Sequence, residues 1–215
     1  MTEGTTDRAS FYPVSLDVTN RRCLVVGAGP VAARKARALV ECGAVVTVIA
    51  PSLSKDMDAL GPSLHTLERR PYRTGDASAF RLVVTATGRP EVDGAVYADA
   101  EAAGVWVNSA DDPAHCSFIL PAVHREGAVT VSVSTGGLSP ALASWLRDGI
   151  ADQWDGEIGT LALLLGEARE RLRDAGVPTE SVNWAHLLDG PLPALVQAGK
   201  IDEARDRIAA ATRQQ

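Results

Sequence analysis

Residues 22–50 read RCLVVGAGPVAARKARALVECGAVVTVIA, and this stretch decides the fold. It begins at 22–26 with a run rich in Val and Leu, which is typical of a buried strand. A glycine turn follows, and then apolar residues recur at helical spacing over 31–42. A second β-branched run at 44–50 closes a β-α-β unit of the usual length, about 30 residues. The stretch therefore predicts the first half of a parallel α/β sheet.

Strand and helix patterns continue to alternate up to residue 108. After a weakly structured stretch, a short strand is predicted within 64–72 and a buried strand at 81–87. A helix at 91–103 and a strand at 105–108 follow. This alternation indicates a doubly wound parallel sheet of the Rossmann type, with ligands at the carboxyl ends of the strands.

The pattern changes after Asp111-Asp112-Pro113. Residues 128–134 alternate between apolar and polar, which predicts an antiparallel strand with one buried face. Ser139 and Pro140 are suited to the N-cap and first turn of a helix. That helix is predicted to carry one apolar face, formed by Leu142, Trp145, Leu146 and Ile150. Further helices follow from 156, so we expect a Rossmann domain at 1–113, a small α+β segment at 114–149 and a helical domain at 150–215.

Composition narrows the class of partner and the compartment. The formal net charge of -6 disfavours nucleic acid or an anionic membrane as the main partner. The three cysteines have no CxxC spacing, which indicates a reducing compartment. The first ten residues are polar, and no run approaches the roughly 20 apolar residues of a membrane helix. We therefore expect a cytoplasmic protein.

The glycine turn at 27–32 has the pattern GxGxxA between a strand and a helix. Gly27 allows the tight turn, Gly29 lets a pyrophosphate approach the backbone, and Ala32 permits close helix packing. The helix N-terminus would stabilise the anion. A purely structural turn is the alternative. The predicted cofactor contacts are Gly27, Gly29, Pro30, Val31, Pro51, Ser52, Thr85 and Thr87.

The second strand lacks the acidic residue that usually binds the adenosine ribose at its end. Ala50, Pro51 and Ser52 stand there instead. Backbone groups and the Ser52 hydroxyl could replace it, and the nearby Lys55 leaves NADP open. We expect NAD as the cofactor.

Two carboxylates follow the strand that ends at Asn108. Asp111 and Asp112 would lie on the nicotinamide edge, where either could accept a proton. The alternative is that Asp112-Pro113 only forms a turn. Asp111, His115 and Cys116 also form a compact set of metal-ligand types, but no second His or Cys pair completes a site. We therefore expect no resident metal.

A third candidate site is the loop Ser134-Thr135-Gly136-Gly137, which precedes the helix cap at Ser139. Its N–H groups and the helix dipole suit a carboxylate or phosphate. A plain capping loop is the alternative.

With these motifs in order, the chain resembles the precorrin-2 dehydrogenase and sirohydrochlorin ferrochelatase family, the N-terminal module of siroheme synthases. In chain order, the matching segments are FYPVSL at 11–16, VVGAGPVAARKARAL at 25–39, GAVVTVIAP at 43–51, VVTATG at 83–88, NSADDPAHCSFILPA at 108–122 and VSVSTGGLSPALASWLR at 131–147. Gly88 departs from the family, in which an Asp often follows the Thr-Ala-Thr strand. Beyond residue 150 the resemblance is only to a generic helical domain.

The resemblance implies NAD-dependent oxidation of precorrin-2 to sirohydrochlorin, and in many members insertion of ferrous iron to give siroheme. It implies a central dimerisation segment and a homodimer. Asp111 matches the family's catalytic aspartate. Thr135 matches a position near the tetrapyrrole, so that Thr135, Gly136 and Gly137 are the predicted substrate contacts. A Rossmann module that only senses a nucleotide is the competing hypothesis.

Overall fold

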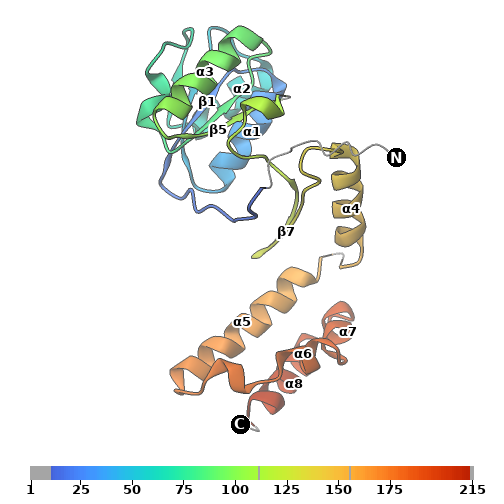
Figure 1. The fold of residues 1–215 in the computed structure, drawn as a ribbon. Coiled ribbons are helices and arrows are strands. Elements are labelled where there is room, and N and C mark those ends of the chain that lie inside the picture. Colours follow the sequence, from blue (N-terminus) through green and yellow to red (C-terminus); the bar gives the residue numbers. More distant parts are fainter. Residues whose placement is uncertain (1–10, 111, 155, 214–215) are drawn as a thin grey trace, which may run out of the picture. The chain divides into compact units, whose positions relative to one another are not determined.

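The computed structural model describes residues 11–110, 112–154 and 156–213. The chain divides into two compact units, of which the first ends at Leu120 and the second begins at Pro121 (Figure 1). The three-part division expected from the sequence stays a prediction.

The first unit is built on a five-stranded parallel sheet with the order β3-β2-β1-β4-β5. Its strands are β1 (Arg22–Val26), β2 (Val45–Ile49), β3 (Thr66–Glu68), β4 (Leu82–Thr85) and β5 (Trp106–Ser109). The strand β1 pairs with β2 on one side and with β4 on the other, so the order reverses at β1. This arrangement confirms the predicted doubly wound sheet.

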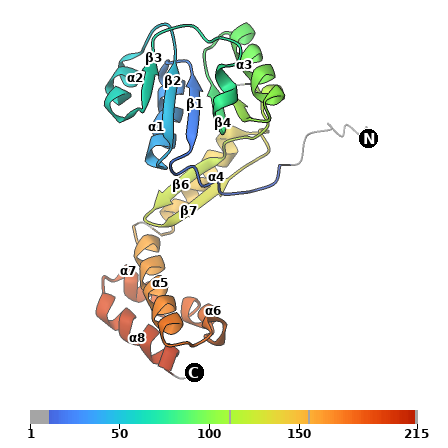
Figure 2. The same cartoon turned by 90° about the vertical axis from the view of Figure 1, so that its left-hand side faces the viewer.

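Helices cover both faces of this sheet (Figure 2). The helices are α1 (Pro30–Glu41), α2 (Lys55–Leu60) and α3 (Pro90–Ala102). One apolar core joins alternate residues of β1, β2 and β4 to α1 and α2, and a second joins the other residues of these strands to β5 and α3. The interior of α1 is lined by Ala32, Ala33 and Ala36. Small side chains therefore allow α1 to lie close to the strands.

The helix α2 lies where the sequence predicts only weak structure. Its six residues are too few to show a helical period. Its start is fixed by Ser54, whose hydroxyl accepts a hydrogen bond from the backbone N–H of Met57. Met57 is completely buried, which ties this short helix to the core.

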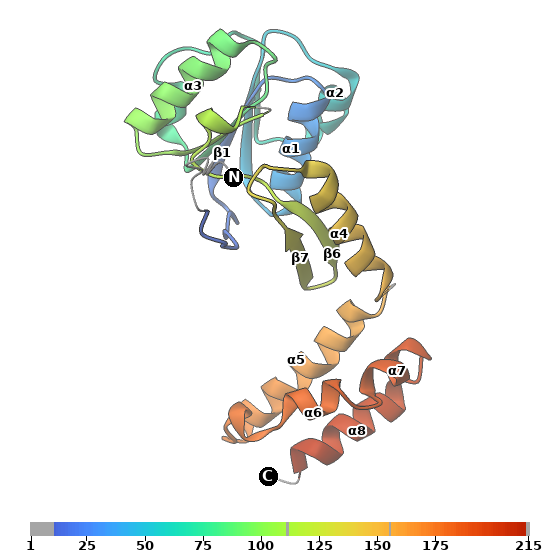
Figure 3. The same cartoon turned by 45° about the vertical axis from the view of Figure 1, so that its right-hand side comes forward.

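The second unit begins with the antiparallel hairpin of β6 (Ala122–Glu126) and β7 (Val129–Val133), followed by α4 (Pro140–Asp152). Figure 3 shows α4 lying along the hairpin. The antiparallel strand predicted at 128–134 is confirmed as β7. Its partner β6 was not predicted, because its AVHRE sequence shows no clear apolar alternation.

The predicted apolar face of α4 exists in sequence but is not covered by this chain. In this helix only Ala143 is classed as buried. Leu142, Trp145 and Leu146 are 47%, 70% and 38% exposed. A two-stranded hairpin and one helix offer too little surface to cover every apolar side chain.

The remaining helices are α5 (Ile158–Asp174), α6 (Trp184–Leu188), α7 (Leu192–Gln197) and α8 (Ile201–Arg213). They share a core that includes Leu164, Leu192 and Ile208. The hairpin is joined to α5, because the Glu126 carboxylate accepts a hydrogen bond of 2.8 Å from the Gly159 N–H. Short 3-10 helices lie at Gly61–Ser63, Asp76–Ala79, Pro113–His115 and Thr179–Ser181. Among the described residues, no helix is both long and apolar enough to cross a bilayer.

Candidate cofactor and catalytic site

The glycine turn connects the end of β1 to α1. Gly27 has a φ of +107°, a conformation that side chains rarely adopt, and a Cβ on it would lie 2.4 Å from the Ala86 carbonyl oxygen. Its N–H donates to the Ile49 carbonyl, which holds the turn against β2. The close approach of two backbone segments explains why only glycine fits at position 27.

Gly29 serves a different purpose. It is the N-cap of α1 with φ -73°, and a Cβ added there would meet nothing within 4 Å. No side chain caps this helix, and its first turn has no acidic residue. Pro30 follows at the first helical position and Val31 is partly buried. An open approach to an uncapped helix N-terminus fits the pyrophosphate of a dinucleotide.

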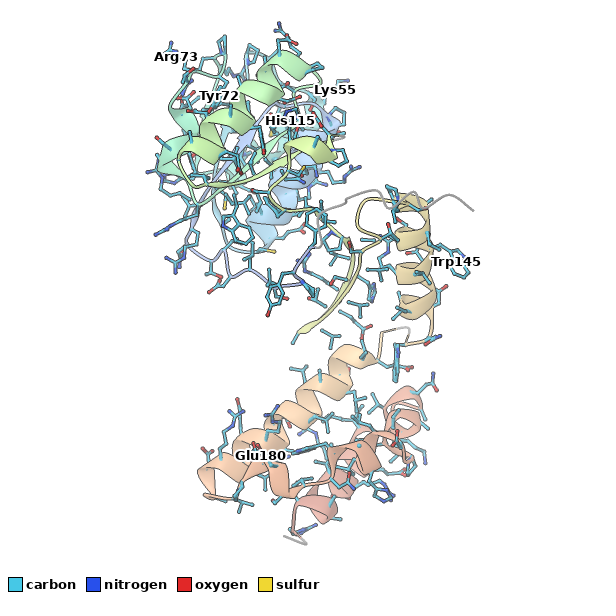
Figure 4. All side chains as sticks on the ribbon, viewed as in Figure 1. Lys55, Tyr72, Arg73, His115, Trp145 and Glu180 are labelled. Atoms are coloured by element: carbon cyan, nitrogen blue, oxygen red, sulfur yellow. The ribbon has the colours of Figure 1, made fainter. Side chains whose placement is uncertain are left out.

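The loop after β2 lies beside the glycine turn. The Ser54 N–H donates to the Ala28 carbonyl at 3.0 Å. Pro51 and Ser52 are exposed, and Lys55 begins α2 just beyond them (Figure 4). Glu68, at the end of the neighbouring strand β3, is bound by Arg70 at 2.6 Å. The contact of Pro51 and Ser52 with the adenosine end of a cofactor stays a prediction.

Thr85 and Thr87 are tied to α3 by one carboxylate. The hydroxyl of Thr85 donates to Asp93, and the hydroxyl and the N–H of Thr87 donate to the same oxygen at 2.9 and 3.2 Å. Thr85 is completely buried and Asp93 is 8% exposed. The structure thus gives the Thr85 hydroxyl a partner within the protein, while Thr87 is only partly buried.

Asp111, the predicted catalytic residue, lies outside the described residues. Its neighbour Ala110 donates its N–H to the Thr85 carbonyl at 2.8 Å. Further along the loop, the Cys116 thiol donates to the carbonyls of Ser109 and Asp112, each at 3.3 Å. The described residues before and after position 111 are therefore held to the carboxyl ends of β4 and β5.

Asp112 is engaged by His115 at 2.6 Å, between a carboxylate oxygen and Nδ1. This hydrogen bond is the main cause of the lowered pKa of the Asp112 carboxyl. The imidazole also packs edge to face against Tyr97 of α3, with ring centroids 4.8 Å apart. A carboxylate with a lowered pKa is a weaker proton acceptor than a free carboxylate, which argues against Asp112 as the base.

Two contacts near this edge were not predicted. Lys35 of α1 reaches Asn108 at the end of β5, with 3.2 Å between Nζ and Oδ1. The Asn108 amide in turn donates to the Phe118 carbonyl at 3.1 Å. The second contact is the set of hydrogen bonds that Asp93 accepts from Thr85 and Thr87, which we call the Asp93 clasp. Its only signal in the sequence was an acidic residue in the first turn of a helix that follows a Thr-rich strand end. Among the described residues, no group of His, Cys, Asp and Glu is arranged to hold a metal ion.

The predicted substrate loop lies in the second unit. Thr135 exchanges two hydrogen bonds with the backbone of Ser139, of 3.0 and 3.1 Å. Ser139 caps α4 by accepting from the Leu142 N–H. Gly136 and Gly137 have φ values of +61° and +80°, and a Cβ added to either would meet no atom within 4 Å. The loop is thus ordered by its own side chains and leaves its two glycines open.

The fold and the glycine turn define a dinucleotide-binding α/β protein. Residues 14–122 match the family described as "Putative NAD(P)-binding", and residues 126–153 match the family "Sirohaem biosynthesis protein central". The chain belongs to this NAD(P)-binding family and carries beside it the central segment of sirohaem biosynthesis proteins.

Curated proteins that are similar to this chain include siroheme synthases. The siroheme synthase of Methylococcus capsulatus is 38% identical over 198 residues, which are 90% of this chain and 42% of that protein. The siroheme synthase of Nitrosomonas europaea is 34% identical over 211 residues, 94% of this chain and 43% of that protein. The chain spans less than half the length of these relatives. A solved structure, "SirC, precorrin-2 dehydrogenase", shares the fold with a TM-score of 0.73 and 23% identity, over 93% of this chain and all of that one.

Proposed function

We propose that the chain oxidises precorrin-2 to sirohydrochlorin in siroheme biosynthesis, with NAD as the hydride acceptor. The observation that carries this proposal is the shared edge of the sheet. The glycine turn after β1 and the loop of residues 110–117 after β5 both follow the carboxyl ends of strands. The siroheme synthase relatives and the fold shared with a precorrin-2 dehydrogenase support the choice of substrate.

The reaction removes a hydride and a proton from the tetrapyrrole and yields NADH. NAD supplies the hydride acceptor when it is bound. In our proposal Asp111 accepts the proton, while Asp112 is held by His115 in its ionised form. The residues Thr135, Gly136 and Gly137 bind a substrate carboxylate at the N-terminus of α4.

Replacement of the carboxylates tests this mechanism. Asp111→Asn should abolish NADH formation from precorrin-2 and NAD while the affinity for NAD stays unchanged. Asp112→Asn is the matched control and should retain most of the rate. Full activity of Asp111→Asn would contradict the assignment, and loss only in Asp112→Asn would transfer the role to Asp112.

We further propose that ferrous iron, as a substrate, is inserted at the same edge. Metal insertion releases two pyrrole protons, and in our proposal the Asp111 carboxylate that serves the dehydrogenase also assists their removal. Siroheme formation from sirohydrochlorin and ferrous iron, measured by absorbance, tests this step separately from the dehydrogenase. A rate equal to the uncatalysed rate would contradict it.

We also propose that the protein is a homodimer that covers the exposed face of α4. Leu138, Leu142, Trp145 and Leu146 form an apolar stripe, and Figure 4 shows Trp145 projecting from α4 into solvent. A second copy of the same stripe would bury it.

The competing hypothesis, a nucleotide sensor, shares the glycine turn but has no evident use for the NSADDP motif at 108–113 or the STGGLSP motif at 134–140. Incubation with NAD and precorrin-2 separates the two. A sensor would bind the nucleotide and form no NADH.

A further inference from the structure

A cavity of about 510 Å³ lies at the amino ends of β1, β4 and β5. It is at the opposite end of the sheet from the glycine turn, which follows the last residue of β1. Three arginines, Arg21, Arg22 and Arg81, line it, and no acidic residue does. Its volume is in the range of ligand sites, about 300–1,000 Å³. The proposed dehydrogenase has no use for this end of the sheet.

Two of the arginines lie on neighbouring, hydrogen-bonded backbone segments. The Arg81 N–H donates to the Arg22 carbonyl at 2.9 Å, just before the paired residues Cys23 and Leu82. Residues at matched positions of neighbouring parallel strands point to the same face, so both side chains leave the backbone on the α3 side. Two like charges at such positions repel each other. In the described part of the chain, neither side chain forms an ion pair with a carboxylate.

The third arginine is close to one carboxylate. Arg21 contributes to the lowered pKa of Asp17, behind the hydrogen bonds from Thr19. Asp17 is not among the residues that line the cavity. The positive charge of Arg22 and Arg81 therefore remains available to a ligand.

Aromatic rings complete the cavity. The Arg22 guanidinium carbon lies 4.9 Å from the centroid of the Phe80 ring, which restrains this side chain. Trp106, at the start of the edge strand β5, is 47% exposed. An indole that keeps half of its surface in solvent can stack on a planar ring. The cavity thus combines arginines, one of them restrained by an aromatic ring, with the half-exposed Trp106 indole, whose ring also lies 6.4 Å from that of Phe118.

We propose that this cavity binds an aromatic anion with at least two negative charges, as found in nucleoside polyphosphates and aromatic polycarboxylates. Guanidinium groups bind phosphate and carboxylate through paired hydrogen bonds, and the ring of the ligand lies against Trp106. Ligand binding would relieve the repulsion between Arg22 and Arg81. This site is independent of the proposed dehydrogenase reaction.

Calorimetric titration with ATP or with mellitate, each in the presence of saturating NAD, tests the proposal. Saturating NAD keeps the probes from the cofactor site. In Arg22→Ser/Arg81→Ser, the affinity for at least one probe should fall about tenfold or more, since two charged hydrogen-bonding groups are lost. The matched control is Arg169→Ser/Arg171→Ser, which removes the same charge from the exposed side of α5 and should leave the affinity unchanged.

The outcomes are distinct. A loss with ATP alone identifies a phosphate ligand, and a loss with mellitate alone identifies a carboxylate ligand. Absence of binding by both probes, or an equal loss in the control, overturns the proposal. Trp106→Ala keeps the charges, and it should weaken ATP more than tripolyphosphate. An unchanged affinity of the arginine variant for NAD verifies that the domain is folded.

Discussion

Gly27 lies so close to Ala86 that a Cβ on the glycine would stand 2.4 Å from the Ala86 carbonyl oxygen. The loop after β1 and the loop after β4 therefore touch through their backbones. In our proposal these two loops form the surface against which a dinucleotide would lie.

Gly27→Ala should consequently destabilise the fold, whereas Gly29→Ala should not. The first change adds a steric clash to a strained φ and should cost about 3 kcal/mol or more of unfolding free energy. At Gly29 the φ suits any residue and the added methyl meets no protein atom, so the stability should hold while NAD affinity falls. Thermal unfolding and NAD titration of both variants check this pair. Equal unfolding temperatures would contradict the first expectation, and unchanged NAD affinity of Gly29→Ala the second.

The Asp93 clasp should be worth measurable stability. Thr85→Val keeps the side-chain shape but removes a buried hydroxyl that donates to Asp93, and it should cost about 1–3 kcal/mol. Denaturant unfolding measures this loss. Glu91→Gln, an exposed change in the same first turn of α3, is the control and should have little effect. A variant Thr85→Val as stable as the unchanged protein would show that the clasp is dispensable.

The stability should decline in alkali because of Cys23. Burial raises the pKa of this thiol from 9.0 to about 11, so the unfolded chain ionises first as the pH rises. The stabilisation is complete below pH 9 and is lost as the pH approaches 11, by about 3 kcal/mol in all. Cys23→Ala should flatten this part of the stability profile. An unchanged slope between pH 9 and 11 in Cys23→Ala would refute the assignment.

The apolar stripe on α4 should control association. Trp145→Glu places a charge in the proposed interface and should shift the protein from dimer to monomer in sedimentation velocity. Asp148→Lys, on an exposed position of the same helix, is the comparison and should leave the dimer intact. A monomer at all concentrations before any substitution would contradict the dimer itself.

The sequence predicts the centre of the sheet well because the buried strands β1, β2 and β4 are rich in Val, Leu and Ile. The range 22–26 is recovered as β1 to the residue, and the glycine turn follows it. The elements that were missed are those whose formation depends on tertiary contacts. The strand β6 has an irregular pattern and is defined by its pairing with β7, and α2 depends on one cap and one buried methionine.

The candidate site follows the same division. Residue types and spacing predict the glycine turn, and the structure shows that backbone geometry restricts position 27 to glycine, while its contact with a cofactor stays a prediction. They do not reveal that the Thr85 hydroxyl donates a hydrogen bond to Asp93 or that Lys35 donates one to Asn108, because these pairs join separate elements. The apolar face of α4 was recognised, but a periodic pattern does not say which surface covers it.

The hydrogen bond between Glu126 and Gly159 has a consequence for any attempt to shorten the protein. The hairpin side chain occupies the first turn of α5, and a Cβ on Gly159 would lie 3.0 Å from the Glu126 carbonyl oxygen. A fragment that starts after residue 149 would expose this helix end to water and lose its anchoring carboxylate. The helices from α5 to α8 should therefore unfold cooperatively with the hairpin and should not form a domain that folds independently of it.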